Sequence, residues 1–482
     1  MLARLGERLA ALFRATAPDP FVIAILLTAL TFILGVFFGA DSPRIVDRPG
    51  EMLDYWQGGF WDLLAFAMQM SLILVTGHTL ASTPIIARLL RRLSSIPRSG
   101  RQAVALTSAV AICFGLVNWG LGLIVGAILA RDVGRAMKAR GVAVPYPLLA
   151  AAGYTAMLCW HGGLSGSAPL QAASSDEVAR LVGAELAAAV GDLPASTTIF
   201  TLHNAITTGG LLVGIPLLLA LMCPKRVEGN GQWGMGNGKS AKEPNGQSAK
   251  ARNSELGTPP PELSTQHSEL RSPTFPERLD RSPIVAWLLA GPALVWLSLH
   301  FADRGLDGLT LNTANLTFFA LGMVLHGSPV RYMEAATEAA GCCAGIIIQF
   351  PLYAGIMGMM RDSGMAAGVS RAFVEASGGS HGGLAVMTFL SAGLVNLFVP
   401  SGGGQWAIQA PVALQAAHDA GADPSRIVMA VAYGDQWTNM LQPFWALPLL
   451  GITGVKARDI VGYTAVALVA AGVWFVACLW LL

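Results

Sequence analysis

The feature that most constrains this chain is a series of apolar blocks, several of them as long as a bilayer is thick. They occupy residues 21–40, 62–87, 103–130, 198–222, 283–300, 314–325, 383–400, 427–452 and 460–482. A helix needs about 20 mostly apolar residues to cross the hydrocarbon core. Only 12% of the residues are charged, against roughly 25% in a soluble protein. The sequence therefore predicts an all-α polytopic membrane protein surrounded by membrane lipids.

The first block resembles a secretory signal peptide, because Arg4, Arg8 and Arg14 precede it. Its apolar run covers residues 21–40, whereas the apolar part of a signal peptide has about 7–15 residues. We therefore interpret it as the first membrane helix, led by a short amphipathic segment.

The charges on the loops predict which side of the membrane each loop occupies. Residues 87–102 carry five basic residues and no acid, and residues 131–145 carry four basic residues and one acid. Residues 41–59 carry four acids against two arginines, and residues 171–197 carry four acids against one. Because basic loops stay in the cytoplasm, the first two loops are expected inside and the last two outside.

Two blocks are expected to form re-entrant hairpins. Both loops that flank 103–130 are predicted to be cytoplasmic, and its middle, NWGLG at 118–122, is typical of a helix break. The second candidate, 383–412, is broken by NLFVPSGGG at 396–404 and is expected to enter from outside. Non-helical backbone at such depth needs surrounding protein or a water-filled cavity. We expect about nine transmembrane helices plus these two hairpins.

The chain divides into two membrane repeats and a hydrophilic segment. Residues 1–222 form the first repeat, and residues 282–482 form a connecting helix and the second repeat. Residues 223–281, rich in Gly, Ser, Pro, Asn and Lys, are expected to form a disordered cytoplasmic linker.

Matching positions at the helix breaks support the repeat. Asn118 and Asn396 are 278 positions apart, as are Gly77 and Gly355. A third pair, Tyr154 and Tyr433, is offset by 279 positions. The predicted sidedness inverts one repeat relative to the other. Inverted repeats with broken helices are typical of alternating-access transporters, although a channel remains an alternative.

The substrate site is expected where the two hairpin tips meet the interrupted helices at 146–170 and 427–452. Backbone N–H groups at a helix start carry partial positive charge and favour a carboxylate. Glycine lets backbone approach a ligand closely, although glycines here could equally serve close helix packing. The predicted substrate-binding residues are Asn118, Trp119, Gly120, Gly122, Ser165, Ser167, Asn396, Ser401, Gly402, Gly403, Gly404 and Trp406.

Ionisable residues deep in apolar blocks are expensive in a bilayer and are usually functional. Asp435, His78 and His161 are such residues, and a hydrogen-bonded structural role is the alternative for each. The predicted cation-coupling set is Asp435, Thr438, Asn439, Gln442 and His78. The coupling ion is either Na⁺ or H⁺.

Other classes of function lack support in the sequence. The six cysteines show no spacing for a metal site or disulfide framework, and we expect no cofactor. The net charge of +2 is too small to suggest nucleic acid. An integral membrane acyltransferase would need a catalytic His–Asp or Cys–His pair, and no such spacing occurs; the protein is not expected to be an enzyme.

Several segments resemble the short-chain fatty acid transporter family, the acetoacetate-operon type of bacterial carrier. They are FWDLLAFAMQ at 60–69, VTGH at 75–78, NWGLG at 118–122, GLSGS at 163–167, VPSGGG at 399–404 and QPFWALP at 442–448. The resemblance implies a multi-pass protein of the bacterial inner membrane that takes up short-chain fatty acid anions such as butyrate or acetoacetate. The linker is longer than the family norm, and His161 stands where a glycine-rich stretch is expected.

The family is also similar to the wider ion transporter superfamily of carboxylate carriers, which implies a homodimer with a moving transport domain. A Na⁺-coupled di- or tricarboxylate carrier is the alternative within transport. Phe398, Val399 and Trp406 favour a substrate with one carboxylate and a short apolar tail.

Overall fold

A computed structural model gives the architecture of the chain. It describes residues 2–39, 46–224, 274–308, 310–378, 380–442 and 444–481. Within these ranges the protein is all-helical and contains no strand, as the apolar blocks predict. The expected linker at 223–281 falls for the most part on residues 225–273, which lie outside the described residues.

The helices follow one another with short connections. In the first half they are α1 (Leu2–Thr16), α2 (Pro20–Phe38), α3 (Arg48–Gly59), α4 (Leu64–Ser82), α5 (Pro84–Ser95), α6 (Gly100–Val117), α7 (Trp119–Ala139), α8 (Tyr146–Tyr154), the 3₁₀ turns η1 (Thr155–Leu158) and η2 (Trp160–Gly162), α9 (Ser167–Ala172), α10 (Ser175–Val182), α11 (Ala184–Val190) and α12 (Leu202–Met222). In the second half they are α13 (Phe275–Asp280), α14 (Pro283–Arg304), η3 (Gly305–Gly308), α15 (Leu311–His326), α16 (Pro329–Ala340), η4 (Gly341–Cys343), α17 (Ala344–Asp362), α18 (Met365–Ala376), α19 (His381–Asn396), α20 (Gly402–Ala420), α21 (Pro424–Thr438), α22 (Leu447–Thr453) and α23 (Ala457–Leu481).

Seven helices among the described residues are long and apolar enough to cross a bilayer: α2, α4, α6, α12, α14, α17 and α23. Their lengths run from 18 to 25 residues, which at 1.5 Å per residue is about 27–38 Å. The chain is therefore a multi-pass membrane protein, and the expected total of nine crossings stays a prediction.

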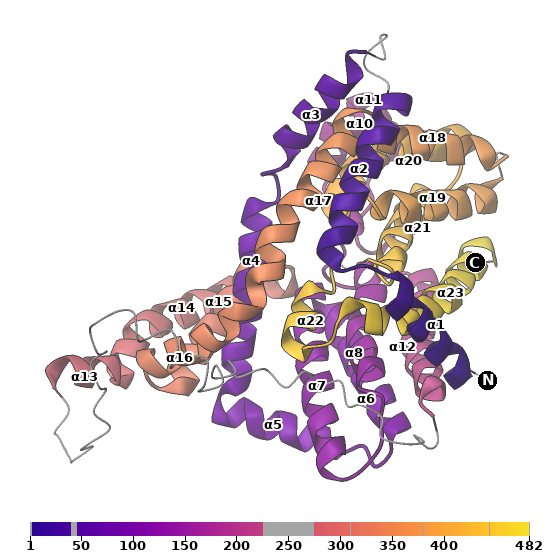
Figure 1. Cartoon of the computed structure of the whole chain (residues 1–482). Coiled ribbons are helices and arrows are strands. Elements are labelled where there is room, and N and C mark those ends of the chain that lie inside the picture. The colour runs from indigo at the N-terminus through magenta and orange to yellow at the C-terminus, as the bar shows by residue number, and fades with distance from the viewer. Residues whose placement is uncertain are drawn as a thin grey trace, which may run out of the picture.

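The amphipathic segment at the N-terminus is a helix, α1, that packs along α23. The backbone of Gly462 on α23 approaches that of Ala10 so closely that a Cβ could not fit between them. The N- and C-terminal helices consequently lie side by side at one edge of the molecule (Figure 1). The first membrane helix then begins at Pro20, where the carboxylate of Asp19 accepts a hydrogen bond from the N–H of Phe21.

The first predicted hairpin is a pair of antiparallel helices, α6 and α7, that meet at Asn118. Asn118 has an extended backbone, with φ −155° and ψ 128°, and its side chain accepts from the N–H of Leu121. The side chain thus caps α7 as α6 ends. Gly122 packs directly on Gly115, so at this position the close-packing role of glycine is observed. Re-entry from one face of the membrane stays a prediction.

The second predicted hairpin is formed by α19 and α20, which also run antiparallel. The amide of Gln405 donates to the carbonyl oxygen of Ala392 at 2.8 Å, and that of Gln409 donates to the hydroxyl of Ser391 at 3.2 Å. The tip ends at Ser401, whose hydroxyl accepts from the N–H of Gly404 at 3.3 Å and caps α20.

Both predicted interrupted helices are broken in the structure. The first passes from α8 through the turns η1 and η2 to the short helix α9. The second changes from α21 to irregular backbone after Thr438 and resumes as α22 at Leu447. These interruptions free backbone groups that the regular part of a helix would use internally.

Helices α14, α15 and α16 project together from one side of the molecule, next to α4 (Figure 1). They form a small apolar cluster of their own around Ala290, Met323 and Tyr332. Most of the other buried apolar residues belong to one large core that joins both halves of the chain.

Candidate functional site

The two interrupted segments cross each other at the centre of the molecule. The backbone N–H of His161 donates to the side-chain oxygen of Gln436 at 2.9 Å. From the same segment, the hydroxyl of Tyr154 donates to the carbonyl oxygen of Asn439, also at 2.9 Å. The amide of Asn439 donates in return to the carbonyl oxygen of Met157 at 3.3 Å. Backbone groups released in one half are therefore bound by the other half.

The tip of the first hairpin rests on the first interrupted segment. The N–H of Trp119 donates to the hydroxyl of Ser165 at 3.0 Å, and the N–H of Leu164 donates to the carbonyl oxygen of Leu116 at 2.7 Å. Ser165 was predicted to bind the anion. Its hydroxyl instead accepts a hydrogen bond from the first N–H of α7. Ser167 begins α9 and is half-buried.

The tip of the second hairpin binds the second interrupted segment through Asn396, which is fully buried. Its side-chain amide lies 2.7 Å from the carbonyl oxygen of Asp435 and 2.9 Å from the side-chain oxygen of Asn439. The hydroxyl of Thr438 is 3.0 Å from the same amide, and the side chain of Gln442 donates to the carbonyl oxygen of Asn396. The structure therefore gathers Asp435, Thr438, Asn439 and Gln442 around Asn396, and their role in coupling stays a prediction.

Asp435 is 1% exposed, and neither of its carboxylate oxygens has a hydrogen-bond partner among the described residues. Of the two neighbours that a structural role would use, Tyr433 is already engaged, whereas the side-chain nitrogen of Gln436, a possible donor, has no partner among the described residues. The hydroxyl of Tyr433 donates to Asn204, and the side-chain oxygen of Gln436 accepts from His161. A buried carboxylate without partners is unfavourable by several kcal/mol, which makes Asp435 a candidate for binding a cation or a proton.

The start of α20 faces the first interrupted segment. A Cβ built on Gly402 would lie 2.6 Å from Nε2 of His161 and 2.7 Å from the ring of Trp160. A Cβ on Gly403 would lie 2.7 Å from the side-chain nitrogen of Gln171. The N–H groups of Gly402 and Gly403 are the first two of α20, so they have no acceptor within the helix. His161 was absent from the predicted site; its ionisable ring in an apolar block was the only signal in the sequence.

The two hairpin tips do not face each other directly, because Trp160 lies between them. Its ring centroid is 6.1 Å from that of Trp119 at the first tip, and its far edge meets Gly402 at the second. Trp445 adds a third indole, 5.1 Å from Trp119. Trp406 is fully buried on α20 and takes no part in these ring contacts. The wall between the tips is therefore apolar and aromatic.

His78 lies apart from the Asp435 set. Its Nε2 is 3.1 Å from a guanidinium nitrogen of Arg131. Both residues line a cleft of about 520 Å³ together with Asp132, Arg135 and Glu338. The structure thus places His78 beside a fixed cation, on the side of the molecule where the basic loops lie.

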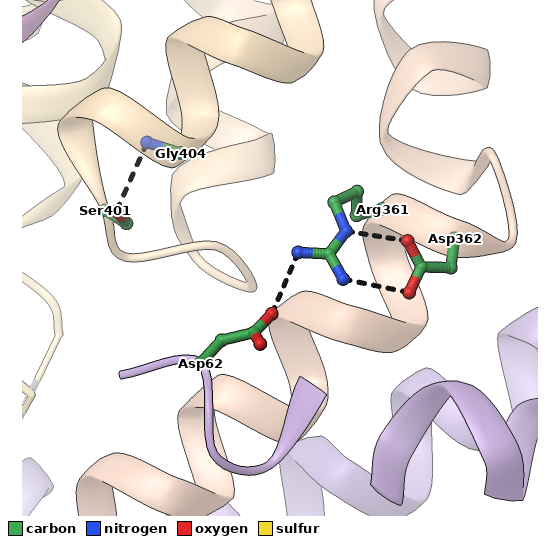
Figure 2. Close-up of polar contacts among 5 residues, drawn as sticks. All are labelled: Asp62, Arg361, Asp362, Ser401 and Gly404. Atoms are coloured by element: carbon green, nitrogen blue, oxygen red, sulfur yellow. Dashed lines mark hydrogen bonds and ion pairs between the residues drawn. The ribbon is translucent and has the colours of Figure 1, made fainter. Parts of the chain in front are cut away.

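Arg361 lies near the end of α17. It is the charged residue of that helix closest in sequence to Met357, which lies against the second tip. It contacts Asp362 through two nitrogens, at 2.6 and 3.0 Å, and Asp62 through the third, at 2.9 Å. Figure 2 shows the guanidinium between the two carboxylates and, on a separate helix, the Ser401–Gly404 cap. The sulfur of Met357, one turn earlier on α17, would lie 3.4 Å from a Cβ on Gly404. Arg361 is thus already paired with two acids.

The whole chain, residues 1–482, matches the family model described as short chain fatty acid transporter. The chain belongs to the short-chain fatty acid transporter family. Two curated relatives agree and are provisionally named as short-chain fatty acid transporters. One, from Escherichia coli (strain K12), is 37% identical over 482 residues and covers 99% of each chain. The other, from Haemophilus influenzae, is 37% identical over 470 residues and covers 97% of each chain. Membership in this family makes the protein a transporter and not an enzyme.

Two solved transporters show a weaker likeness. The YdaH transporter of Alcanivorax borkumensis aligns with 96% of this chain and 98% of its own, at 15% identity and a TM-score of 0.43. MtrF of Neisseria gonorrhoeae, from a work on antimetabolite efflux pumps, aligns with 96% of this chain and 95% of its own, at 17% identity and a TM-score of 0.37.

Proposed function

We propose that this member of the family carries short-chain fatty acid anions, such as butyrate or acetoacetate, across the bacterial inner membrane. Transport is secondary active, coupled to a cation, and proceeds by alternating access. The observation that carries this proposal is the start of α20. Its two free N–H donors lie against a buried break from the other half of the chain. Such a break near the midplane is where transporters bind anionic substrates.

The walls around this point suit a substrate with one carboxylate. Trp119, Trp160 and Trp445 supply apolar surface next to the hairpin tips. Arg361 on α17 is paired with Asp62 and Asp362 and so offers no free cation to a second carboxylate. A short acyl tail can pack on the indoles, whereas a second carboxylate would be desolvated there without a partner.

Asp435 is the proposed coupling residue, together with the oxygens of Thr438 and Asn439. These groups lie at the break of α21, where Asn396 at the second hairpin tip also binds. A cation that binds there bridges the hairpin and the interrupted helix, so its binding is coupled to the position of the tip. Na⁺ and H⁺ are both compatible with a carboxylate among neutral oxygens. We further propose that the protein works as a homodimer.

Counterflow in proteoliposomes tests the proposed function. Vesicles loaded with unlabelled butyrate should accumulate labelled butyrate transiently, whereas protein-free vesicles should not. Na⁺ and pH are varied separately, and the ion whose gradient drives net uptake is the coupling ion. Acetoacetate should compete with butyrate, and succinate and citrate should not. Competition by succinate or citrate alone, without butyrate exchange, would replace this proposal with a di- or tricarboxylate carrier.

A further inference from the structure

The imidazole of His161 is held in one orientation by its surroundings. Its Nδ1 lies 2.9 Å from the carbonyl oxygen of Ala432, and its backbone N–H is bound by Gln436. The next carbonyl, that of Gly162, accepts from the amide of Asn204 at 2.8 Å. Because a carbonyl oxygen only accepts, Nδ1 carries a hydrogen, and the neutral ring presents a lone pair at Nε2.

This Nε2 is directed at the start of α20. His161 is 0% exposed, and its Nε2 has no hydrogen-bond partner among the described residues. A Cβ built on Gly402 would lie 2.6 Å from this nitrogen. A helix start carries partial positive charge, so it favours the neutral ring over the imidazolium unless an anion lies between them. The ring and the helix start therefore attract a carboxylate together, once the ring is protonated.

Further donors surround the same point. The indole N–H of Trp160 is buried without a partner in the described part of the chain, although the edge of this indole that touches Gly402 is its six-membered ring. The side-chain nitrogen of Gln171 faces Gly403. Side chains of the first interrupted segment and α9 thus lie against the first two residues of α20.

We propose that His161 is the residue that recognises the substrate carboxylate, and that it binds one proton together with each anion. When the second hairpin tip moves away from the ring, the carboxylate enters between Nε2 and the N–H groups of Gly402 and Gly403. Nε2 takes a proton from water on the same side and donates it to the carboxylate as a hydrogen bond. Anion and proton leave together on the other side, so this step moves no net charge. The inference rests on the proposed function and names the recognition residue within it.

Other titratable groups near His161 set the controls. Asp435 and Tyr433 lie on α21, Cys159 precedes the ring in its own segment, and His203 lies on α12. The charged or titratable groups of α20, His418 and Asp419, are at its far end. His203 makes a matched control, because its Nε2 is also buried without a described partner and its ring stacks on Tyr433, away from α20.

The test uses the purified full-length protein in detergent. Stabilisation against thermal unfolding is measured as a function of butyrate concentration at pH 6 and pH 8, where butyrate is ionised. The wild-type protein and His203→Gln should bind butyrate at least tenfold more tightly at pH 6 than at pH 8. His161→Gln should bind at least tenfold more weakly than wild type at pH 6 and show no such pH dependence.

The outcomes separate this inference from the proposed function. Wild-type affinity and pH dependence in His161→Gln would overturn the inference and leave butyrate transport intact. Stabilisation by another carboxylate, such as succinate, that is lost in His161→Gln would keep the inference and overturn the proposed substrate. No stabilisation of the wild-type protein by butyrate, acetoacetate, succinate or citrate would overturn both.

Discussion

The backbone N–H of His161 and the side-chain oxygen of Gln436 form a 2.9 Å hydrogen bond between the two halves of the chain. Each residue lies beside a helix interruption. Groups at each interruption therefore find a hydrogen-bond partner in the other half of the chain. Movement of one interrupted segment must either break this hydrogen bond or move the other segment with it. The bond is thus a direct mechanical connection between the two halves at the candidate site.

Gly402→Ala should abolish butyrate exchange, whereas Gly403→Ala should reduce the exchange rate only in part. The added Cβ at Gly402 meets His161 and Trp160, and the His161 ring is held by Ala432. At Gly403 the obstacle is the end of the flexible Gln171 side chain. A bulky residue at Gly403, such as Leu, should then abolish exchange too. Exchange rates in proteoliposomes, normalised to inserted protein, provide the measurement. Equal activity of Gly402→Ala and wild type would move the site away from α20.

Asp435→Asn should retain butyrate exchange but lose concentrative uptake. Exchange requires no net cation movement, whereas accumulation does, and the neutral amide cannot bind the driving ion as the carboxylate does. The measurement compares counterflow with uptake driven by an imposed Na⁺ gradient at equal pH on both sides, so that a proton carried on His161 supplies no driving force. Asp423→Asn, a capping change at the start of the same helix, provides the control. Accumulation by Asp435→Asn with unchanged ion dependence would make this carboxylate structural.

Asn396→Ala should destabilise the protein more than Asn118→Ala, although both residues stand at hairpin tips. Asn118 caps α7 through one hydrogen bond, and loss of such a cap costs about 0.5–2 kcal/mol. The side-chain amide of Asn396 donates to the carbonyl oxygen of Asp435 and to the side-chain oxygen of Asn439. Each of these buried oxygens left unpaired costs about 1–3 kcal/mol. Thermal unfolding of the purified variants should show the larger decrease for Asn396→Ala. The reverse order would contradict the tight anchoring of the second tip.

Sidedness can be tested with single cysteines in a variant lacking the six native ones. Arg98→Cys, in the exposed basic loop before α6, should resist a membrane-impermeant maleimide in intact cells and react after lysis. Glu185→Cys, exposed on α11, should react in intact cells, because its loop is acidic. A cysteine at Ser240, outside the described residues, should behave like the one at Arg98. Labelling of Arg98→Cys from outside would invert the proposed topology.

The helix breaks were the part of the site most open to prediction. Asn118 is followed by a Trp-Gly pair, and Ser401 is followed by three glycines; such residues end or cap helices for local reasons. The burial of Asp435 also followed from its apolar neighbours in sequence.

The position of His161 opposite Gly402 could not be predicted, because it depends on how distant segments pack. The two residues are 241 positions apart, half the length of the chain, and the local sequence of either one contains no record of the other. His78 illustrates the same limit in the opposite sense. Its place in an apolar block suggested a role beside Asp435, but the helix turns it toward Arg131. Hydrophobic periodicity shows which face of a helix is buried and not which neighbour covers it.

Gly126 on α7 and Gly153 on α8 approach so closely that a Cβ on either one would collide with the carbonyl of the other. At this point the two helices meet backbone to backbone, with no layer of side chains that could change rotamers and let one slide over the other. The first hairpin and the interrupted helix behind it are therefore expected to be displaced as one rigid piece. A disulfide engineered between the end of α7 and the start of α8 would leave turnover unaffected. The flexible joints of the transport cycle belong at the ends of this rigid piece.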